Sequence, residues 1–166
     1  DSLIREDFIN RKMYLYKNAH VVYTDMDLTA GYIEVDYMND LIIARGIKDS
    51  IGEYSELPVF RQGNEESIQD SLVINFKNKK ALIDEIQIDY GGSGMENLKI
   101  NAKRGKKHND SIVFLKDVRI TTSAKEEPDY YIRIKKAKFI KDKKLVAGSS
   151  QLVIADVPTP VILPFA

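Results

Sequence analysis

The chain has 166 residues, 43% of them hydrophobic and 30% charged, which fits one domain with a core and excludes a disordered chain. Its 25 basic and 25 acidic residues cancel, which argues against a nucleic-acid-binding protein. The absence of cysteine excludes disulfides, thiolate metal sites and cysteine nucleophiles.

No apolar run in the sequence approaches the roughly 18 residues that a membrane-spanning helix requires. The sequence therefore predicts no such helix. The sequence starts at Asp1 without Met or a signal peptide. We expect a mature or excised fragment.

Residues 1–17 contain two apolar segments separated by the polar turn Asn10-Arg11-Lys12. The same design recurs over 70–83, and a third copy begins at 110–114. Each copy predicts a strand, a turn and a strand. Internal repetition of a hairpin is typical of an all-β stack, barrel or jelly roll.

Residues 18–46 show the clearest strand pattern, because apolar residues occupy alternate positions in three successive segments. Asp and Asn lie between these segments, at 24–27 and 38–40, where their side chains favour turns. This stretch therefore predicts three strands of a half-buried sheet.

The connection over 49–66 carries Gly52, Pro58 and Gly63, and it predicts a long loop with one short strand near Val59-Phe60. Alternation returns over 82–90, and the glycines of 91–94 predict a flexible turn.

Two later segments, 98–107 and 131–144, are basic, and Ile132 and Ile134 alternate with Arg133 and Lys135 in the second. This pattern predicts strands with one wet face and a hairpin turn at 141–143. The alternative interpretation is a surface that faces anions, such as phosphorylated lipid heads or an acidic partner.

The final segment, 151–165, predicts a strand followed by Pro158, Pro160 and Pro164. Because proline cannot donate a ladder hydrogen bond, we expect residues 158–166 to leave the sheet as an extended exit segment. The domain itself is expected to span residues 1–157.

Candidate catalytic or metal-binding groups are sparse. His20 and His108 have no second ligand at suitable spacing, and Asp25, Asp27 and Asp36 fit hairpin turns better than a Ca²⁺ loop. We therefore expect no enzyme, no metal and no cofactor, and a binding scaffold instead. A sheet rich in Ile, Val, Leu, Phe and Tyr can either hold lipid on its inner face or fill an ordinary core with its own side chains.

A resemblance favours the first interpretation. It lies in the order of short motifs along almost the whole chain: Ala19-x-Val21-x-Tyr23-x-Asp25-x-x-Leu28-x-Ala30-x-x-Ile33-x-Val35-Asp36, Ala44-x-Gly46, Pro58-Val59-Phe60, Asp70-Ser71, Ile120-Thr121-Thr122, Pro128-Asp129-Tyr130 and Val157-Pro158-Thr159-Pro160. This pattern resembles the OstA-like domain of lipopolysaccharide transport proteins, and most of all the amino-terminal periplasmic domain of the LptD family. That family often has Cys where this chain has Ser123, so the resemblance does not extend to a disulfide.

The resemblance implies an incomplete antiparallel β-jelly-roll of folded, stacked sheets with open edges. It implies a non-catalytic conduit at the periplasmic face of the outer membrane, which passes lipopolysaccharide acyl chains (lipid A) toward a barrel beyond the exit segment. The implied partners are a periplasmic bridge protein joined by strand-to-strand edge pairing, and the outer-membrane barrel with its lipoprotein; no nucleic acid is expected. We expect the lipid-binding groove to be lined by Val21, Tyr23, Ile33, Val35, Leu72, Ile74, Phe76, Phe114, Ile132 and Ile134.

Two alternatives remain. One is a free periplasmic bridge protein of the LptA type without a barrel partner. The other, from a different class, is a structural or carbohydrate-binding β-sandwich with a closed, side-chain-filled core.

Overall fold

A computed structural model describes residues 3–63, 65–90, 98–141 and 144–164, and these residues form antiparallel β-sheet without any helix. No described segment is therefore a helix that could cross a membrane. The strands are β1 (Leu3–Asp7), β2 (Lys12–Tyr23), β3 (Met26–Asp36), β4 (Leu41–Arg45), β5 (Ile47–Lys48), β6 (Tyr54–Ser55), β7 (Val59–Gln62), β8 (Glu65–Ile68), β9 (Ser71–Asn75), β10 (Ala81–Tyr90), β11 (Leu98–Asn109), β12 (Ile112–Thr121), β13 (Tyr130–Ile140), β14 (Lys144–Ala147), β15 (Ser150–Ile154) and β16 (Val157–Leu163).

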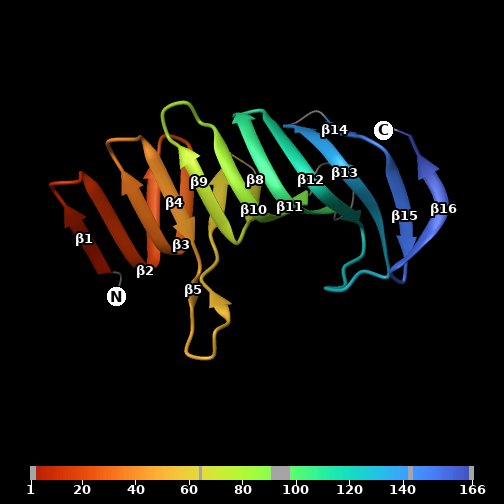
Figure 1. Cartoon of the computed structure of the whole chain (residues 1–166), viewed down its shortest axis with the longest axis horizontal. Coiled ribbons are helices and arrows are strands. Elements are labelled where there is room, and N and C mark those ends of the chain that lie inside the picture. The colour runs from red at the N-terminus through yellow and green to blue at the C-terminus, as the bar shows by residue number, and fades with distance from the viewer. Residues whose placement is uncertain (1–2, 64, 91–97, 142–143, 165–166) are drawn as a thin grey trace.

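The strands follow one another along the sheet in the order β1-β2-β3-β4-β9-β10-β11-β12-β13-β15-β16, so the two chain ends lie at opposite ends of the molecule (Figure 1). The expected all-β class is confirmed. The three strands expected over 18–46 are β2, β3 and β4, and the short strand near Val59-Phe60 is β7. The glycine turn expected at 91–94 and most of the turn at 141–143 lie outside the described residues.

The long strands change neighbours at one level of the sheet. The first half of β3, residues 26–29, pairs with β7, and its second half, 32–36, pairs with β4. Similarly, β10 pairs with β9 through 81–84 and with β8 at Gln87 and Ile88. Six strands, β3, β4, β9, β10, β8 and β7, thereby close a ring of hydrogen-bonded neighbours.

The ladders are interrupted at this same level, which we call the fold line. Glu85, Lys103, Asp117 and Lys135 have no partner in the registers of β10–β13, although the pairs on either side keep the same register. Glu85 and Asp117 have positive φ, at 51° and 53°. A local break of this kind bends a strand, so the sheet folds over along the line.

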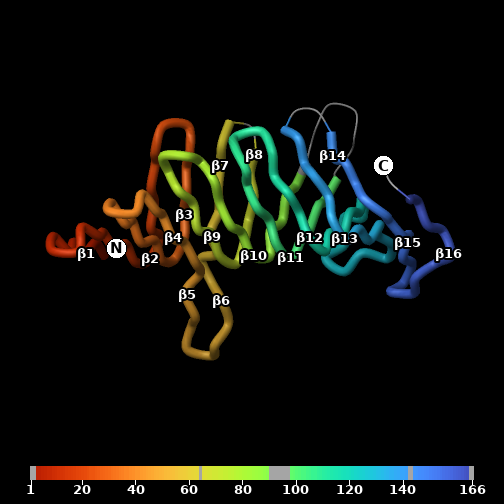
Figure 2. The backbone as a smooth tube through the Cα atoms, turned by 45° about the horizontal axis from the view of Figure 1, so that its top comes forward, coloured from red at the N-terminus to blue at the C-terminus, as the bar shows by residue number. Residues whose placement is uncertain are grey.

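The fold line divides the sheet into two panels that face each other across the core. Panel A contains β1, β4, β9, β14 and the adjoining halves of the long strands, and panel B contains β7, β8, β15, β16 and the other halves. At the N-terminal end, panel A is therefore one strand longer than panel B, because β1 belongs to it. At the C-terminal end, panel B is longer, because β16 belongs to it. Strands β5 and β6 project as a separate finger (Figure 2).

Apolar side chains of both panels share one core, which explains why the panels close on each other. Near the fold line the inner positions are small, including Ala19, Ala30, Ala44 and Ala102, all of them buried. Small side chains allow the two panels to approach closely where they join.

The exit segment is the exception to the sequence expectation. Residues 157–163 do not leave the sheet but form β16, which pairs with β15 and places Pro158 opposite Val153. The prolines are tolerated because β16 is an edge strand, where a missing N–H removes no ladder bond on the solvent side. A register shift between Gln151 and Val153 accommodates them.

Gly46 lies where β4 meets the fold line, and a Cβ there would approach the Ser55 backbone oxygen to 2.9 Å. We expect Gly46→Ala to lower the free energy of unfolding by about 1–3 kcal/mol, the usual cost of overpacking, measured by urea denaturation. Gly105→Ala is the control, because its Cβ would meet Ile83 and Leu115 at ordinary distances of 3.5–3.6 Å. Equal stability of the two variants would contradict close packing of β6 against the end of β4.

Candidate functional site

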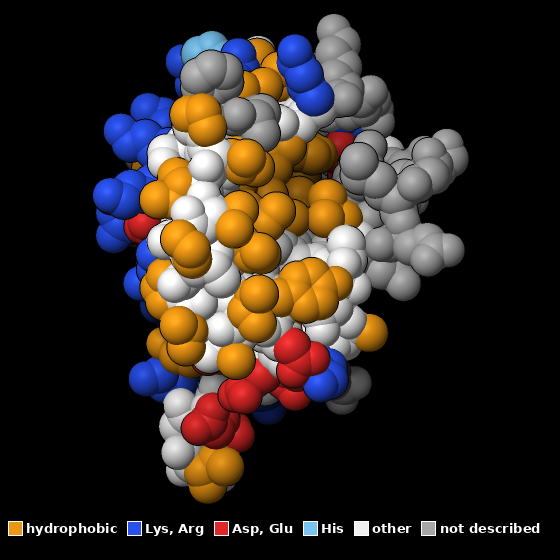
Figure 3. All heavy atoms as spheres, turned by 90° about the vertical axis from the view of Figure 1, so that its right-hand side faces the viewer, with side chains coloured by type: hydrophobic (Ala, Val, Ile, Leu, Met, Phe, Trp, Pro, Cys, Tyr) orange, Lys and Arg blue, Asp and Glu red, His pale blue; other side chains and the backbone are white. Residues whose placement is uncertain are grey.

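One row of inner-face side chains runs from the closed part of the molecule to its C-terminal end. It consists of cross-strand partners on β10, β11, β12, β13 and β15: Ile88, Ile100, Ile120, Ile132 and Leu152. Ile100 is 1% exposed, whereas Ile132 is 38% exposed. The interior therefore continues as an apolar surface that reaches solvent. Figure 3 looks at this end and shows apolar side chains gathered around a hollow.

Most of the expected groove residues lie on the inner faces. The buried ones are Ile33, Val35, Leu72, Ile74 and Ile134, and the half-buried ones packed against them are Val21 and Phe76. Tyr23 is partly exposed, but its ring lies 5.4 Å from that of Phe76, across the two panels. Together with Ile132, these residues surround a shared interior.

Phe114 is the correction. It is 45% exposed and lies on the outer face of β12, because its neighbour Leu115 occupies the inward position. The fold line explains the error. In β12, inward side chains have odd residue numbers before Asp117, as at Leu115, and even numbers after it, as at Val118, because Asp117 interrupts the alternation. A single parity carried through the strand cannot describe both halves.

Sequence reasoning missed several residues of the same interior. They are the buried side chains Ile83, Ile86, Ile88, Ile100, Leu115, Val118 and Phe139. The alternation over 82–90 predicts a strand, and its isoleucines are the signal for an apolar face. Their assignment to one face requires the shift at Glu85, where Ile83 and Ile86 both point inward.

A polar cluster, which we call the latch, joins the panels at the rim opposite the fold line. The Lys107 ammonium on panel A donates to Gln62 Oε1 on panel B at 2.6 Å. The Gln62 amide in turn donates to Asp25 at 2.9 Å and to Asp110 at 3.3 Å. Lys141 donates to the backbone oxygen of Gln62 at 3.3 Å.

Burial and charge compete within the latch. Lys107 is only 6% exposed, and this burial lowers its pKa below the ordinary value despite the nearby carboxylate of Asp110. Burial also raises the pKa of Asp110, but hydrogen bonds from Lys79 and Gln62 outweigh it and leave that pKa lowered. The latch therefore holds a desolvated ammonium against its carboxylate, with Gln62 as the acceptor that satisfies it.

The space beneath the latch is small, with a cavity of about 60 Å³ bounded by side chains such as Phe60, Ile86 and Phe139. Small-molecule sites usually occupy about 300–1,000 Å³. The closed part of the interior is therefore filled by its own side chains, and the inner apolar surface reaches solvent at the open C-terminal end, as at Ile132.

The turn expected at 38–40 is confirmed, whereas Asp27, expected in the turn at 24–27, lies inside β3 opposite Val22. Asp36 accepts hydrogen bonds from the backbone of Met38 and Asn39, and Asn39 also donates through its side chain. His20 is exposed and pairs with Asp27 at 3.0 Å. Within the described ranges, no group of three or more His, Cys, Asp or Glu side chains is placed to hold a metal ion.

Comparison with protein-family models and with curated proteins finds no match for this chain.

We expect Gln62→Leu to lower the free energy of unfolding by about 1–3 kcal/mol, because Lys107 remains buried without its closest acceptor. Adding Lys107→Met should recover part of that loss, since it removes the buried ammonium but does not restore the hydrogen bonds from Gln62 to Asp25 and Asp110. Urea denaturation followed by circular dichroism measures both changes.

Arg61→Leu is the control for this cycle, because Arg61 is exposed on the same strand and pairs only with Glu66 among the described residues. Its effect should stay within about 0.5 kcal/mol. A double variant as unstable as Gln62→Leu alone would show that Gln62 does not act by satisfying Lys107.

Proposed function

We propose that this chain is a non-catalytic lipid-binding conduit domain, which holds lipopolysaccharide acyl chains between its panels during transport across the periplasm. In this proposal the folded sheet is an incomplete β-jelly-roll of the OstA-like type. Two observations support it: opposed apolar inner faces, and a sequence pattern that resembles lipopolysaccharide transport proteins.

The row from Ile88 to Leu152 is the observation that carries the proposal. An acyl chain placed along it would contact a continuous apolar surface that begins in the core and ends in solvent. Burial of hydrocarbon contributes about 0.8 kcal/mol per CH₂, so binding requires no catalytic or charged group. Entry would occur at the open end, or between the panels once the latch separates.

The sheet edges support the proposed partners. Among the described strands, β1 and β16 each have a neighbour on one side only. Unpaired edges are sites for strand addition by another protein. Under this proposal a periplasmic bridge protein pairs with one edge, and the other edge leads toward an outer-membrane barrel and its lipoprotein, which places the domain at the periplasmic face of the outer membrane.

A structural β-sandwich is the second candidate, and the filled interior favours it. If the panels never part, the cavity of about 60 Å³ has no room for an acyl chain. The two candidates differ in one measurable property, which is capture of dispersed lipid by the folded protein.

Native mass spectrometry with dispersed lipid A tests the proposal. We expect a stoichiometric complex that Ile132→Glu weakens by roughly 10–100-fold, because the variant loses about 1.5–3 kcal/mol of apolar burial and places a charge in the path of the acyl chain.

Ile68→Glu is the matched control, since Ile68 is 36% exposed but lies on β8 opposite Gln87, on the outside of panel B. It should bind lipid A as the unmodified chain does. No binding by the folded unmodified protein would overturn the conduit and favour the structural sandwich, and equal loss in both variants would overturn the site.

A further inference from the structure

The outside of panel A carries an amphipathic surface that the proposed conduit does not use. Two rows of outward side chains cross β10–β13, each made of cross-strand partners. The first row extends to β14 and mixes apolar and basic residues: Leu82, Lys106, Phe114, Lys138 and Val146. The second row is mostly basic: Asp84, Arg104, Lys116 and Lys136.

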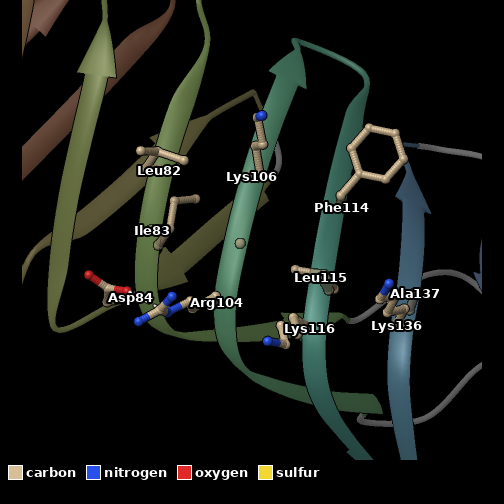
Figure 4. A pocket seen from close by; sticks show the side chains of 11 residues that line it. Leu82, Ile83, Asp84, Arg104, Lys106, Phe114, Leu115, Lys116, Lys136 and Ala137 are labelled. Carbon is tan, nitrogen blue, oxygen red and sulfur yellow. Dashed lines mark ion pairs between the residues drawn. The ribbon is translucent and has the colours of Figure 1, made fainter.

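A groove of about 540 Å³ lies between the two rows. The backbone of four residues forms its floor: Ile83, Gly105, Leu115 and Ala137. The side chains of Ile83, Leu115 and Ala137 point inward, away from the groove. Figure 4 shows Lys106 and Phe114 on one side of this groove, with Arg104 and Lys116 on the other. The groove is therefore open to solvent, with one wall that mixes apolar and basic side chains and one wall that is mostly basic.

The surface is strongly basic although the chain as a whole is neutral. Five cations stand on the two rows, namely Arg104, Lys106, Lys116, Lys136 and Lys138, against the single carboxylate of Asp84. Of these five, Arg104 alone forms an ion pair among the described residues, with Asp84 at 3.7 Å. The other four positive charges have no carboxylate within ion-pair distance in the described chain.

Large apolar side chains stand among these cations. Leu82 is 60% exposed and Phe114 is 45% exposed, and Lys138 lies over the Phe114 ring at 5.8 Å. Their grouping with cations on one face makes this surface amphipathic. Single-stranded nucleic acid is recognised through several stacking aromatics, and Phe114 is the one aromatic ring in these rows.

We infer that this outer face of panel A docks onto a bilayer that contains phosphate-bearing lipids. The cations lie on adjacent strands of one panel, so several can meet a charged lipid surface at once. Leu82, Phe114 and Val146 then enter the interfacial layer beside them, as apolar residues of surface-bound proteins do. The groove between the rows accommodates headgroup phosphates.

Flotation with vesicles of phosphatidylcholine, with and without phosphatidylglycerol, tests this inference. We expect binding to the anionic vesicles that weakens with salt, because the attraction is electrostatic. The triple variant Lys106→Gln, Lys116→Gln, Lys136→Gln should weaken it on the order of a hundredfold, since each basic residue near such a surface contributes roughly fivefold.

The matched control is Lys17→Gln, Lys48→Gln, Lys125→Gln, which removes three exposed lysines outside this face. It should bind within about twofold of the unmodified chain if position rather than total charge matters. Phe114→Ser should weaken binding and leave its salt dependence unchanged, which separates the apolar contribution from the ionic one.

Four outcomes would overturn the inference. They are no binding to anionic vesicles by the folded chain, equal loss in the control triple variant, tighter binding to a single-stranded oligonucleotide than to vesicles, and displacement by millimolar inorganic phosphate, which would indicate a site for a single anion. The inference does not depend on the conduit. Ile132→Glu changes only the inner face and should still bind vesicles even where capture of lipid A is lost.

Discussion

The interrupted hydrogen bonding along the fold line is the constraint on which the rest of this structure depends. Glu85, Lys103, Asp117 and Lys135 lack ladder partners at one level, so four neighbouring strands bend together and remain in register on both sides. A break in a single strand would have produced an isolated bulge. Because the breaks are aligned, one continuous sheet provides both walls of the interior, and no separate second sheet is needed.

This design separates the chemistry of the two surfaces. Inner positions are apolar and become smaller toward the fold line, while the polar groups that join the walls are concentrated at the opposite rim around Gln62 and Lys107. Outer positions of β11–β13 carry most of the basic residues of that half. A net charge of zero therefore describes the composition of the chain and conceals an uneven distribution of charge over its surface.

Much of this fold could be predicted from the sequence, because alternation over 18–46 and 82–90 identifies strands directly. The assignment of faces could not be carried through the bends, as Phe114 shows, since a period of two gives no warning of where Asp117 shifts it. The latch was also beyond reach, because Gln62, Lys107 and Asp110 come from distant segments and only the folding of the panels brings them together. Pro158 and Pro160 predict an exit from the sheet because proline lacks the N–H of a ladder hydrogen bond. An edge strand also tolerates that missing N–H, so the sequence does not distinguish the two.

The unequal ends of the two panels give the molecule a direction. Panel A overhangs by β1 at one end, and panel B overhangs by β16 at the other. A neighbour with the same outline could fill both steps at once with its unlike end or, through a two-fold axis, with its like end, because that axis places the longer panel of one copy against the shorter panel of the other. The backbone outline therefore allows both an open row of such units and a closed pair, and the side chains at the junction would decide which of the two forms.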